Sequence, residues 1–573
     1  MNTLVIVLIA VVVLGAGYVF YGRHLAKKWG IDPKAETPAV KYNDGKDYVP
    51  TNGWTVFSHQ FSSIAGAGPV TGAIQAAVFG WLPVLLWILI GGVFFGAVTD
   101  FGALYASVKN QGKSMGMLIE KYIGKTGRKL FLLFCWLFSL LIIAVFADMV
   151  SGTFNAFDDV TGKLAANASV NGSAGMVSIM FMVFAVIFGL IQKKFNFSGW
   201  KEAVLGIVFI VASFAVGMQF PLEFSKTTWS YVVFVYIFFA AILPIWLMKQ
   251  PRDYMTTIMF VCMIVGAALG LVIGHPTMNL PVFTGFKNEQ LGTMFPILFV
   301  TVACGAVSGF HSLVSSGTSS KTIANEKDML KVGYGAMILE SVLAVLALCV
   351  AGAAAKNGIP AEGTPFQIFS SGVAGFFEKM GLSVHLSTVF MTMCVSALAL
   401  TTLDAVARIG RMCFQEFFSV DDMKHAKPWR KVVCNTYFST IVTLLCGFVL
   451  TKIGYQTIWP LFGSANQLLS ALVLITLCVF LKVTGRSNKM LFPPMIIMLC
   501  VTFTALVQRV IGLVKSLAAG TDIFASVIQL VVAVLLIVLA VIIAINSLKS
   551  YVHSKKNSEV EEKMETVEEV KGC

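Results

Sequence analysis

The sequence predicts an all-α polytopic membrane protein with about 15 transmembrane helices. Its 573 residues are 57% hydrophobic and only 12% charged, whereas charged residues make up about a quarter of an ordinary soluble chain. Runs of roughly 20 apolar residues, long enough to cross a bilayer as helix, follow one another almost to the C-terminus. The composition therefore excludes a soluble globular protein, and the lipid bilayer is the first partner that it implies.

The apolar runs define the expected spans. The first run lacks a basic segment before it and carries Tyr18, Phe20 and Tyr21 where a signal peptide would need small residues, so we expect a permanent span. The expected spans are residues 3–21, 57–79, 82–107, 130–156, 174–192, 202–219, 229–248, 254–274, 292–314, 332–355, 386–407, 432–451, 456–481, 490–513 and 523–547.

The distribution of Lys and Arg predicts the orientation. With the N-terminus outside and the C-terminus in the cytoplasm, 34 of the 42 basic residues fall in loops on the cytoplasmic side, as the positive-inside rule requires. The net charge of +13 is therefore explained by membrane topology, and we expect no nucleic-acid partner. Six glutamates between Glu559 and Glu569 predict a solvated acidic tail in the cytoplasm.

Two spans carry glycine, proline and polar residues that interrupt a helix. The second span contains Gly66, Gly68 and Pro69, which weaken a helix or remove a backbone donor from it. The ninth contains Gly305 and Gly309 and places three serines on one helical face beside His311. Close packing of small residues would explain either segment alone. The two together favour interrupted helices, because loosened backbone survives in a membrane only where protein or a water-filled cavity satisfies it.

The positions of these segments predict two inverted repeats. Spans 2–6 and 9–13 run in opposite directions, and each repeat carries an acid in its second helix, Asp100 and Glu340. Inverted repeats whose first helices are broken are typical of secondary transporters. The expected units are a peripheral helix and loop (1–56), the first repeat (57–219), an inserted helix pair (220–291), the second repeat (292–481), peripheral helices (482–547) and the tail (548–573).

In this arrangement the substrate binds where the breaks meet. Freed N–H groups and helix N-termini suit a carboxylate, and freed carbonyls suit a cation or an ammonium group. The expected substrate-binding residues are Gly66, Ala67, Gly68, Pro69, Gly305, Ser308, Gly309, His311 and Ser312.

Four residues are candidates for proton coupling: His59, Asp100, His311 and Glu340. An imidazole titrates near physiological pH, and a carboxylate facing lipid would cost about 2.5–3.5 kcal/mol. A structural histidine bonded to a loosened carbonyl is the competing interpretation.

Two further acids have local explanations. Asp404 has Arg408 four residues later, which predicts an i,i+4 ion pair. Asp148 is expected to lie towards the outside, where partial solvation would accommodate its charge.

Four segments resemble the signatures of the carbon starvation protein A (CstA) family: HQFSSIAGAGPVTG (His59–Gly72), FVTVACGAVSGFHSLVSSGT (Phe299–Thr318), LTTLD (Leu400–Asp404) and WPLFGSANQLL (Trp459–Leu469). The resemblance covers residues from about 50 to about 490. It implies an inner-membrane transporter of the amino acid–polyamine–cation superfamily with a LeuT-like core of five plus five helices. It also implies peptide uptake during carbon limitation, or import of pyruvate with protons. The chain departs from the pattern at Gln60, where a second histidine is expected.

The resemblance also suggests a sodium site formed by Ala65, Gly66, Thr401 and Thr402. Against it, threonines in membrane helices commonly bond back to their own carbonyls. We therefore expect no cofactor, and Na⁺ is the one metal that the resemblance suggests. Asn466 and Gln467 are expected to form a polar contact between helices rather than to touch substrate.

The predicted function is therefore a secondary importer of small peptides, driven by a proton or sodium gradient. The alternatives are a proton symporter for pyruvate or another monocarboxylate, and a channel or facilitator. We expect no enzyme, because the histidines are dispersed, and no ATP-driven transport, because no Walker motif appears. The sequence does not specify the oligomeric state.

Overall fold

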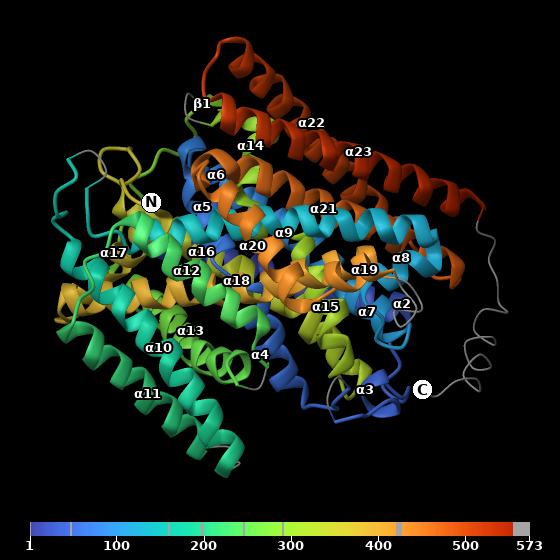
Figure 1. Ribbon diagram of the computed structural model, residues 1–573, viewed down its shortest axis with the longest axis horizontal. Helices are drawn as coiled ribbons and strands as arrows, with labels where there is room; N and C mark the ends of the chain where they lie inside the picture. The colour runs from blue at the N-terminus through green and yellow to red at the C-terminus, as the bar shows by residue number, and fades with distance from the viewer. Residues whose placement is uncertain are drawn as a thin grey trace.

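The computed structural model describes residues 2–45, 48–158, 161–195, 200–244, 247–288, 291–419 and 427–553. The elements of the described chain are all helices except for the two-residue strands β1 (Lys287–Asn288) and β2 (Gly292–Thr293), which pair antiparallel. Most of the long helices run roughly parallel to one axis of the molecule (Figure 1). The predicted tail from residue 554 onward lies outside the described residues.

Every predicted span corresponds to a helical segment, although not all are long. Twelve helices in the described chain are long and apolar enough to cross a membrane. The others are shorter apolar helices at Gly68–Phe79, Lys226–Ile242 and Thr436–Thr451. The protein is thus an all-helical, multi-pass membrane protein, as predicted.

The first half of the chain supplies the N-terminal helices, the first predicted repeat and the inserted pair. Their bounds are α1 (Thr3–Ala16), η1 (Gly17–Gly22), α2 (Arg23–Trp29), α3 (Pro38–Lys41), α4 (Gly53–Ile64), α5 (Gly68–Ala76), η2 (Ala77–Phe79), α6 (Trp81–Gly91), η3 (Gly92–Gly96), α7 (Ala97–Val108), α8 (Met115–Ile123), α9 (Lys125–Thr153), α10 (Ala168–Phe195), α11 (Trp200–Gln219), α12 (Lys226–Ile242) and α13 (Lys249–Gly274).

The second half supplies the second predicted repeat and the last helices. Their bounds are α14 (Met294–Val302), η4 (Ala303–Gly305), α15 (Gly309–Gly317), η5 (Ser319–Lys321), η6 (Glu326–Asp328), η7 (Leu330–Gly335), α16 (Ala336–Ala354), α17 (Pro365–Glu378), α18 (Val384–Phe418), α19 (Pro428–Val433), α20 (Thr436–Thr451), α21 (Tyr455–Val483), η8 (Lys489–Leu491), α22 (Phe492–Ala518) and α23 (Ile523–His553).

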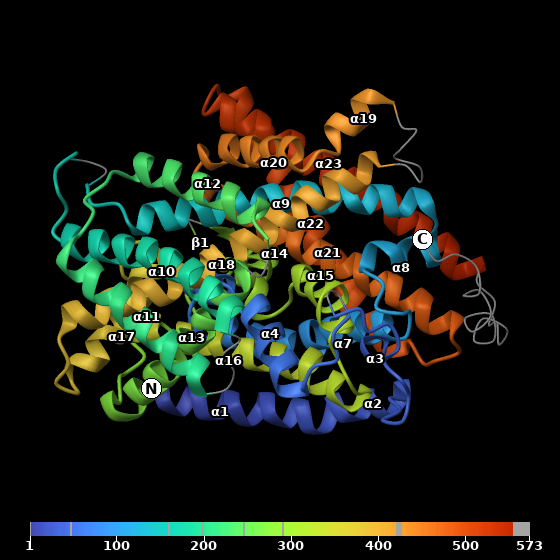
Figure 2. The ribbon, with the colours of Figure 1, turned by 60° about the horizontal axis from the view of Figure 1, so that its bottom comes forward.

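Helices α9, α18 and α21 form the centre of the bundle. Helix α9 packs along α18 and α21, and nearly all of α21 is buried. Helix α1 lies along one edge of the molecule (Figure 2), and α22 and α23 lie together along another (Figure 1). These outer helices expose large apolar side chains such as Leu8, Ile511 and Val538, as expected of surfaces that face lipid.

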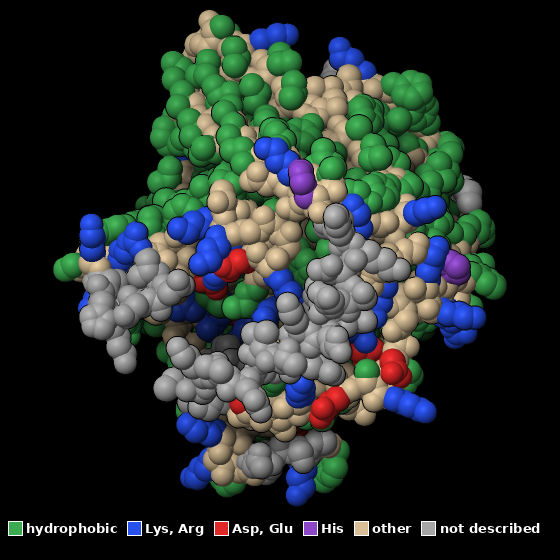
Figure 3. Space-filling view, turned by 90° about the vertical axis from the view of Figure 1, so that its right-hand side faces the viewer, with side chains coloured by type: hydrophobic (Ala, Val, Ile, Leu, Met, Phe, Trp, Pro, Cys, Tyr) green, Lys and Arg blue, Asp and Glu red, His purple; other side chains and the backbone are tan. Residues whose placement is uncertain are grey.

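One end of the molecule is rich in basic side chains. Figure 3 views this end, where Lys and Arg gather below an apolar surface. Helices α2, α3, α8 and α19 lie at this end in Figure 1, and their loops were predicted to be cytoplasmic. The basic end is therefore the one that the positive-inside rule assigns to the cytoplasm.

Candidate functional site

The first interrupted helix breaks at residues 65–67, between α4 and α5, as predicted. A Cβ atom added at Gly66 would lie 2.4 Å from the Thr402 hydroxyl oxygen, and one at Gly68 would lie 2.7 Å from the Cys304 sulfur. Both positions need glycine because α18 and the second interruption approach the backbone so closely.

The second interrupted helix breaks between α14 and α15, also as predicted. Ala303 has a positive φ of 43°, and Ser308 is extended before α15 begins at Gly309. The break frees carbonyl groups at the end of α14 and N–H groups at the start of α15, which must be satisfied because the segment is buried.

Side chains of α21 satisfy much of this freed backbone. The Asn466 side-chain oxygen accepts hydrogen bonds from the Phe310 N–H and the Ser308 hydroxyl, both at 3.2 Å. The Gln467 amide donates to the Phe299 carbonyl at 2.7 Å. Trp459 donates in the same way to Thr301 at 3.0 Å. The expected contact between helices is confirmed, and its role is to hold both halves of the second interrupted helix.

The two interruptions meet around a small cavity, which we call the central cavity. Its volume is about 20 Å³, roughly enough for one water molecule. This cavity therefore has no room for a peptide. The lining residues are Ile64, Gly66, Gly68, Phe138, Ile142, Phe146, Cys304, Phe310, Thr402, Phe462 and Asn466.

Only some of the predicted substrate-binding residues line this cavity. Gly66 and Gly68 line it, Ala67 and Gly305 lie buried in the two breaks, and Pro69 lies buried in the first turn of α5. The others lie along the start of α15: Ser308, Gly309, His311 and Ser312. Sequence reasoning did not identify the aromatic side chains of the wall, because isolated phenylalanines in apolar helices carry no distinguishing signal.

Three of the four predicted coupling residues form one cluster, which we call the His311 triad. His311 Nδ1 lies 3.0 Å from Asp100 Oδ2, and His311 Nε2 lies 3.3 Å from Glu340 Oε2. All three side chains are fully buried. Within the described chain, Asp100 Oδ1 and both Glu340 oxygens lack a hydrogen-bond donor of good geometry. Buried acceptors of this kind are costly unless they bind protons.

The two acids of the triad follow matching irregularities in their helices. Asp100 and Glu340 each lie little more than one turn beyond a π-helix, η3 (Gly92–Gly96) and η7 (Leu330–Gly335) respectively. The Tyr334 hydroxyl of η7 donates to the Val93 carbonyl of η3 at 2.8 Å, so the two π-helices touch. Such segments recur at functional sites. Their only sequence signal was the glycines that they contain.

The fourth candidate, His59, is not part of the triad. It is exposed on α4, the half of the first interrupted helix that precedes the break. Its neighbour Gln60 is buried: its amide nitrogen donates to the Ser315 hydroxyl at 2.8 Å, and its oxygen accepts from the Ser319 hydroxyl at 2.6 Å. Gln60 therefore ties α4 to α15 and η5 on this side of the central cavity.

The suggested sodium ligands are only partly brought together. Thr402 lies against Gly66, as a site between α18 and the first interruption requires. The Thr401 and Thr402 hydroxyls donate to the Ala397 and Leu398 carbonyls of their own helix, at 2.8 and 3.1 Å. The competing interpretation of these threonines is thus observed, although each hydroxyl oxygen keeps lone pairs for a cation.

The prediction that Asp404 pairs with Arg408 is wrong. Asp404 forms a buried ion pair with Arg252, which also binds Tyr236 and Asp253. Arg408 instead donates to backbone carbonyls at the end of α12. The i,i+4 rule considers only one helix, and here α13 brings a cation from 152 residues away in the chain.

The expected solvation of Asp148 is also wrong. Asp148 is only 4% exposed. Its carboxylate pairs with Lys226 at 2.9 Å and accepts a hydrogen bond from the Tyr455 N–H at 2.8 Å. The charge is therefore balanced by protein groups from α12 and α21, two elements whose approach to α9 the sequence did not reveal.

A helical bundle with two interrupted helices that meet around a small cavity is typical of membrane transport proteins. The family model described as "Carbon starvation protein CstA" matches residues 2–359 and 349–505. The chain therefore belongs to the CstA family, as the four signature segments indicated, and it is a transporter rather than an enzyme.

Characterised relatives match over most of their length. "Pyruvate/proton symporter BtsT" of Escherichia coli is 31% identical, with 88% of this chain and 81% of the relative covered. "Peptide transporter CstA" of Escherichia coli is 30% identical, with 84% and 77% covered. "Peptide transporter CstA" of Bacillus subtilis is 30% identical, with 86% and 87% covered. A crystal structure of the Eremococcus coleocola manganese transporter aligns over 90% of this chain and 99% of its own, with 13% identity and a TM-score of 0.47.

Proposed function

We propose that this protein is a proton-coupled importer of small peptides in the inner membrane, working by alternating access during carbon starvation. Relatives named as peptide transporters support the cargo class. The two interrupted helices support a LeuT-like core of five plus five helices. The basic end of the molecule supports a cytoplasmic C-terminus and an outer N-terminus.

The observation that carries proton coupling is the His311 triad. With a neutral imidazole and two ionised carboxylates, the triad would hold two negative charges in a fully buried place, at a large cost in solvation free energy. One added proton makes an imidazolium that can donate to both acids, and a second protonates a carboxylate. The triad therefore favours uptake and release of protons as its surroundings change.

The triad is connected to the substrate region through α15. Phe310 lines the central cavity, and the next residue, His311, faces the acids of α7 and α16. A change in the charge of the triad alters the attraction between α15 and these two helices. Proton binding and the shape of the central cavity are thus coupled through one short helix.

Both sides of the central cavity are closed by contacts between the interrupted helices. On the cytoplasmic side Gln60 joins α4 to Ser315 and Ser319. On the other side Gly72 of α5 lies so close to α14 that an added Cβ would be 2.3 Å from the Val302 carbonyl oxygen. Opening one set of contacts while the other holds is the exchange that alternating access requires.

A pyruvate–proton symporter is the second candidate, favoured by the relative of that name. The freed N–H groups of the interrupted helices would serve a monocarboxylate as well as the C-terminus of a peptide. The proposal has two secondary parts. One is a sodium ion bound at Ala65, Gly66, Thr401 and Thr402, and the other is a role for His59 in proton coupling.

Uptake by purified protein in liposomes tests the proposal. Di- and tripeptides, single amino acids and pyruvate are offered under imposed proton or sodium gradients. We expect peptide accumulation driven by the proton gradient. It should fall by about tenfold or more in Asp100→Asn, Glu340→Gln and His311→Gln, the effect of losing roughly 1.4 kcal/mol of coupling free energy.

Glu326→Gln is the matched control. Glu326 is a buried acid that pairs with Lys109 at 2.6 Å, away from the triad. It should keep the proton dependence of uptake, whatever it does to stability. Uptake of pyruvate without uptake of peptides would favour the pyruvate–proton symporter instead. Downhill flux that ignores both gradients would leave a channel or facilitator and refute the coupling role of the triad.

A further inference from the structure

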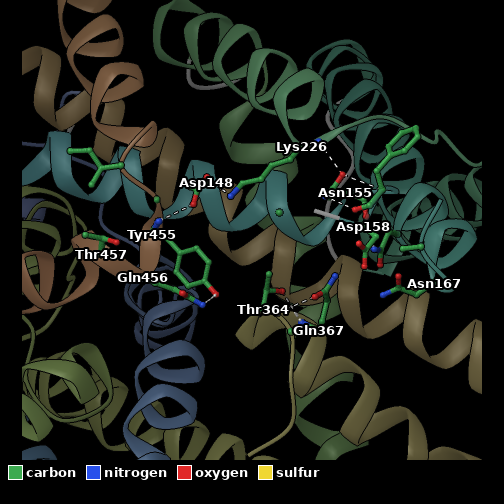
Figure 4. A pocket seen from close by; sticks show the side chains of 17 residues that line it. Asp148, Asn155, Asp158, Asn167, Lys226, Thr364, Gln367, Tyr455, Gln456 and Thr457 are labelled. Atoms are coloured by element: carbon green, nitrogen blue, oxygen red, sulfur yellow. Dashed lines mark hydrogen bonds and ion pairs between the residues drawn. The ribbon is translucent and has the colours of Figure 1, made fainter. Parts of the chain in front are cut away.

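A second and much larger cavity lies away from the central cavity and the triad, and we call it the outer cavity. Its volume is about 560 Å³, within the range of sites that bind small ligands. It lies at the end of α9 and at the starts of α12, α17 and α21 (Figure 4). The positive-inside rule assigns this end of the molecule to the outside.

The outer cavity contains an ammonium group with capacity for a ligand. Lys226 contacts Asp148 Oδ1 at 2.9 Å, and its side chain is 39% exposed. Within the described chain that carboxylate is its one ion-pair partner, and a lysine has three hydrogens to donate. The other Asp148 oxygen accepts from Tyr455 N–H, which fixes the ion pair at the wall of the cavity (Figure 4).

Several helices begin at this cavity and present their N-termini to it. Lys226 is the first residue of α12, Thr364 caps α17, and Tyr455 is the first residue of α21. Helix N-termini carry partial positive charge and favour a carboxylate nearby. They add to the charge of Lys226 on the same wall.

The rest of the wall suits a peptide better than a simple monocarboxylate. Five carboxamides line the cavity: Asn155, Asn167, Asn171, Gln367 and Gln456. Four of them already donate within the protein: Asn155, Asn171 and Gln367 donate to backbone carbonyls, and Gln456 donates to the Tyr455 hydroxyl. A carboxamide has two N–H hydrogens and an acceptor oxygen, so such groups can also bond to the peptide bonds of a ligand. Asp148 pairs with Lys226, and a further carboxylate, Asp158, which accepts a hydrogen bond from the Thr161 N–H at 2.7 Å, also lines the cavity. An acidic wall beside a lysine favours a ligand that carries a positive amine as well as a carboxylate.

We propose that the outer cavity is a docking site for zwitterionic peptides of two or three residues. The peptide carboxylate binds Lys226, the amino terminus faces the acidic side chains, and the carboxamides bind the peptide bonds. This inference rests on the proposed function, because it assigns the peptide class to the transporter, and it adds a binding site separate from the central cavity.

Protection of a single introduced cysteine tests the docking site directly. Asn167 is exposed and lines the cavity, so Asn167→Cys should react with a charged maleimide that does not cross membranes. Trialanine should slow this reaction at least about threefold, and pyruvate at equal concentration should not. Lys163→Cys, exposed on the same loop but not in the wall, is the control that no solute should protect. Wild-type protein gives the background of native cysteines.

Transport kinetics give a second test. Lys226→Gln should raise the KM for trialanine about tenfold with little change in maximal rate, whereas Lys163→Gln, which removes the same charge from the same face, should leave both unchanged. Protection by pyruvate, equal protection of both cysteines, or an unchanged KM in Lys226→Gln would overturn the docking site. If wild-type protein accumulates no peptide yet trialanine still protects Asn167→Cys, the docking site stands and the proposed transport function fails.

Discussion

Asn466 offers the sharpest test of how the second interrupted helix is held. Its side-chain oxygen accepts hydrogen bonds from the Phe310 N–H and the Ser308 hydroxyl, and its amide nitrogen donates to the Cys304 sulfur at 3.3 Å. Asn466→Leu keeps a similar side-chain volume and removes all three hydrogen bonds, so the substitution isolates their contribution.

The structure allows the size of the effect to be worked out. A buried N–H left without a partner costs about 1–3 kcal/mol, and a lost neutral hydrogen bond about 0.5–1.5 kcal/mol. The larger apolar surface of leucine offsets roughly 1 kcal/mol. We therefore expect a net loss of about 2 kcal/mol in the free energy of unfolding, about a thirtyfold change in the equilibrium.

Unfolding by SDS in mixed micelles, followed by tryptophan fluorescence, measures this loss. The alkylation rate of Cys304 by a small maleimide gives a local readout, and it should rise because the Asn466 amide no longer holds the sulfur. Thr476→Val on the same helix is the control: its hydroxyl bonds the Leu472 carbonyl of its own helix at 2.9 Å, so the substitution should cost about 1 kcal/mol or less. If Asn466→Leu is no more destabilising than Thr476→Val and alkylation is unchanged, Asn466 does not hold the break.

Two further predictions concern packing. Arg252→Gln removes the cation of Asp404 and should cost about 3–5 kcal/mol in the same unfolding assay; adding Asp404→Asn should recover a large part, and an additive double loss would refute the ion pair. Gly72→Ala would place a Cβ 2.3 Å from the Val302 carbonyl oxygen and should cost about 1–3 kcal/mol. Gly317→Ala meets nothing within 4 Å and should be neutral or stabilising, so equal effects of the two alanines would contradict the close approach of α5 and α14.

Sequence patterns predicted the fold better than they predicted partners. Apolar runs located every span, and Gly66, Gly68 and Pro69 located the first break, because both signals are local. Helix α17 was not predicted, since its 14 residues are too short and too mixed for an apolar run. His311, Asp100 and Glu340 were each identified, but the contact between His311 and Asp100 joins residues 211 positions apart. No local rule places two such residues together.

The partners of Asp404 and Asp148 were missed for the same reason. In both cases a cation from the inserted helix pair, Arg252 or Lys226, balances an acid of the predicted repeats. Acids within a membrane are almost always paired, so Asp404 and Asp148 indicate that partners exist. The sequence does not indicate which cations they are, and the nearby Arg408 was the wrong choice for Asp404. The outer cavity could not be predicted from the sequence either, because it is formed by loops and helix ends from four separate parts of the chain.

Helix α15 concentrates the proposed mechanism in nine residues, roughly 13 Å of helix. At its start Phe310 lines the central cavity, and the adjacent His311 meets the two buried acids. One turn later the Ser315 hydroxyl accepts a hydrogen bond from the Gln60 amide. In the proposed mechanism this contact closes the cytoplasmic side of the central cavity. A helix this short moves as a unit, so a shift of its first turn towards or away from Asp100 and Glu340 is transmitted to Ser315. Proton occupancy, the cavity wall and the cytoplasmic closure are then linked without any longer pathway. The linkage predicts that the triad variants change how readily α4 separates from α15, as well as how many protons accompany each peptide.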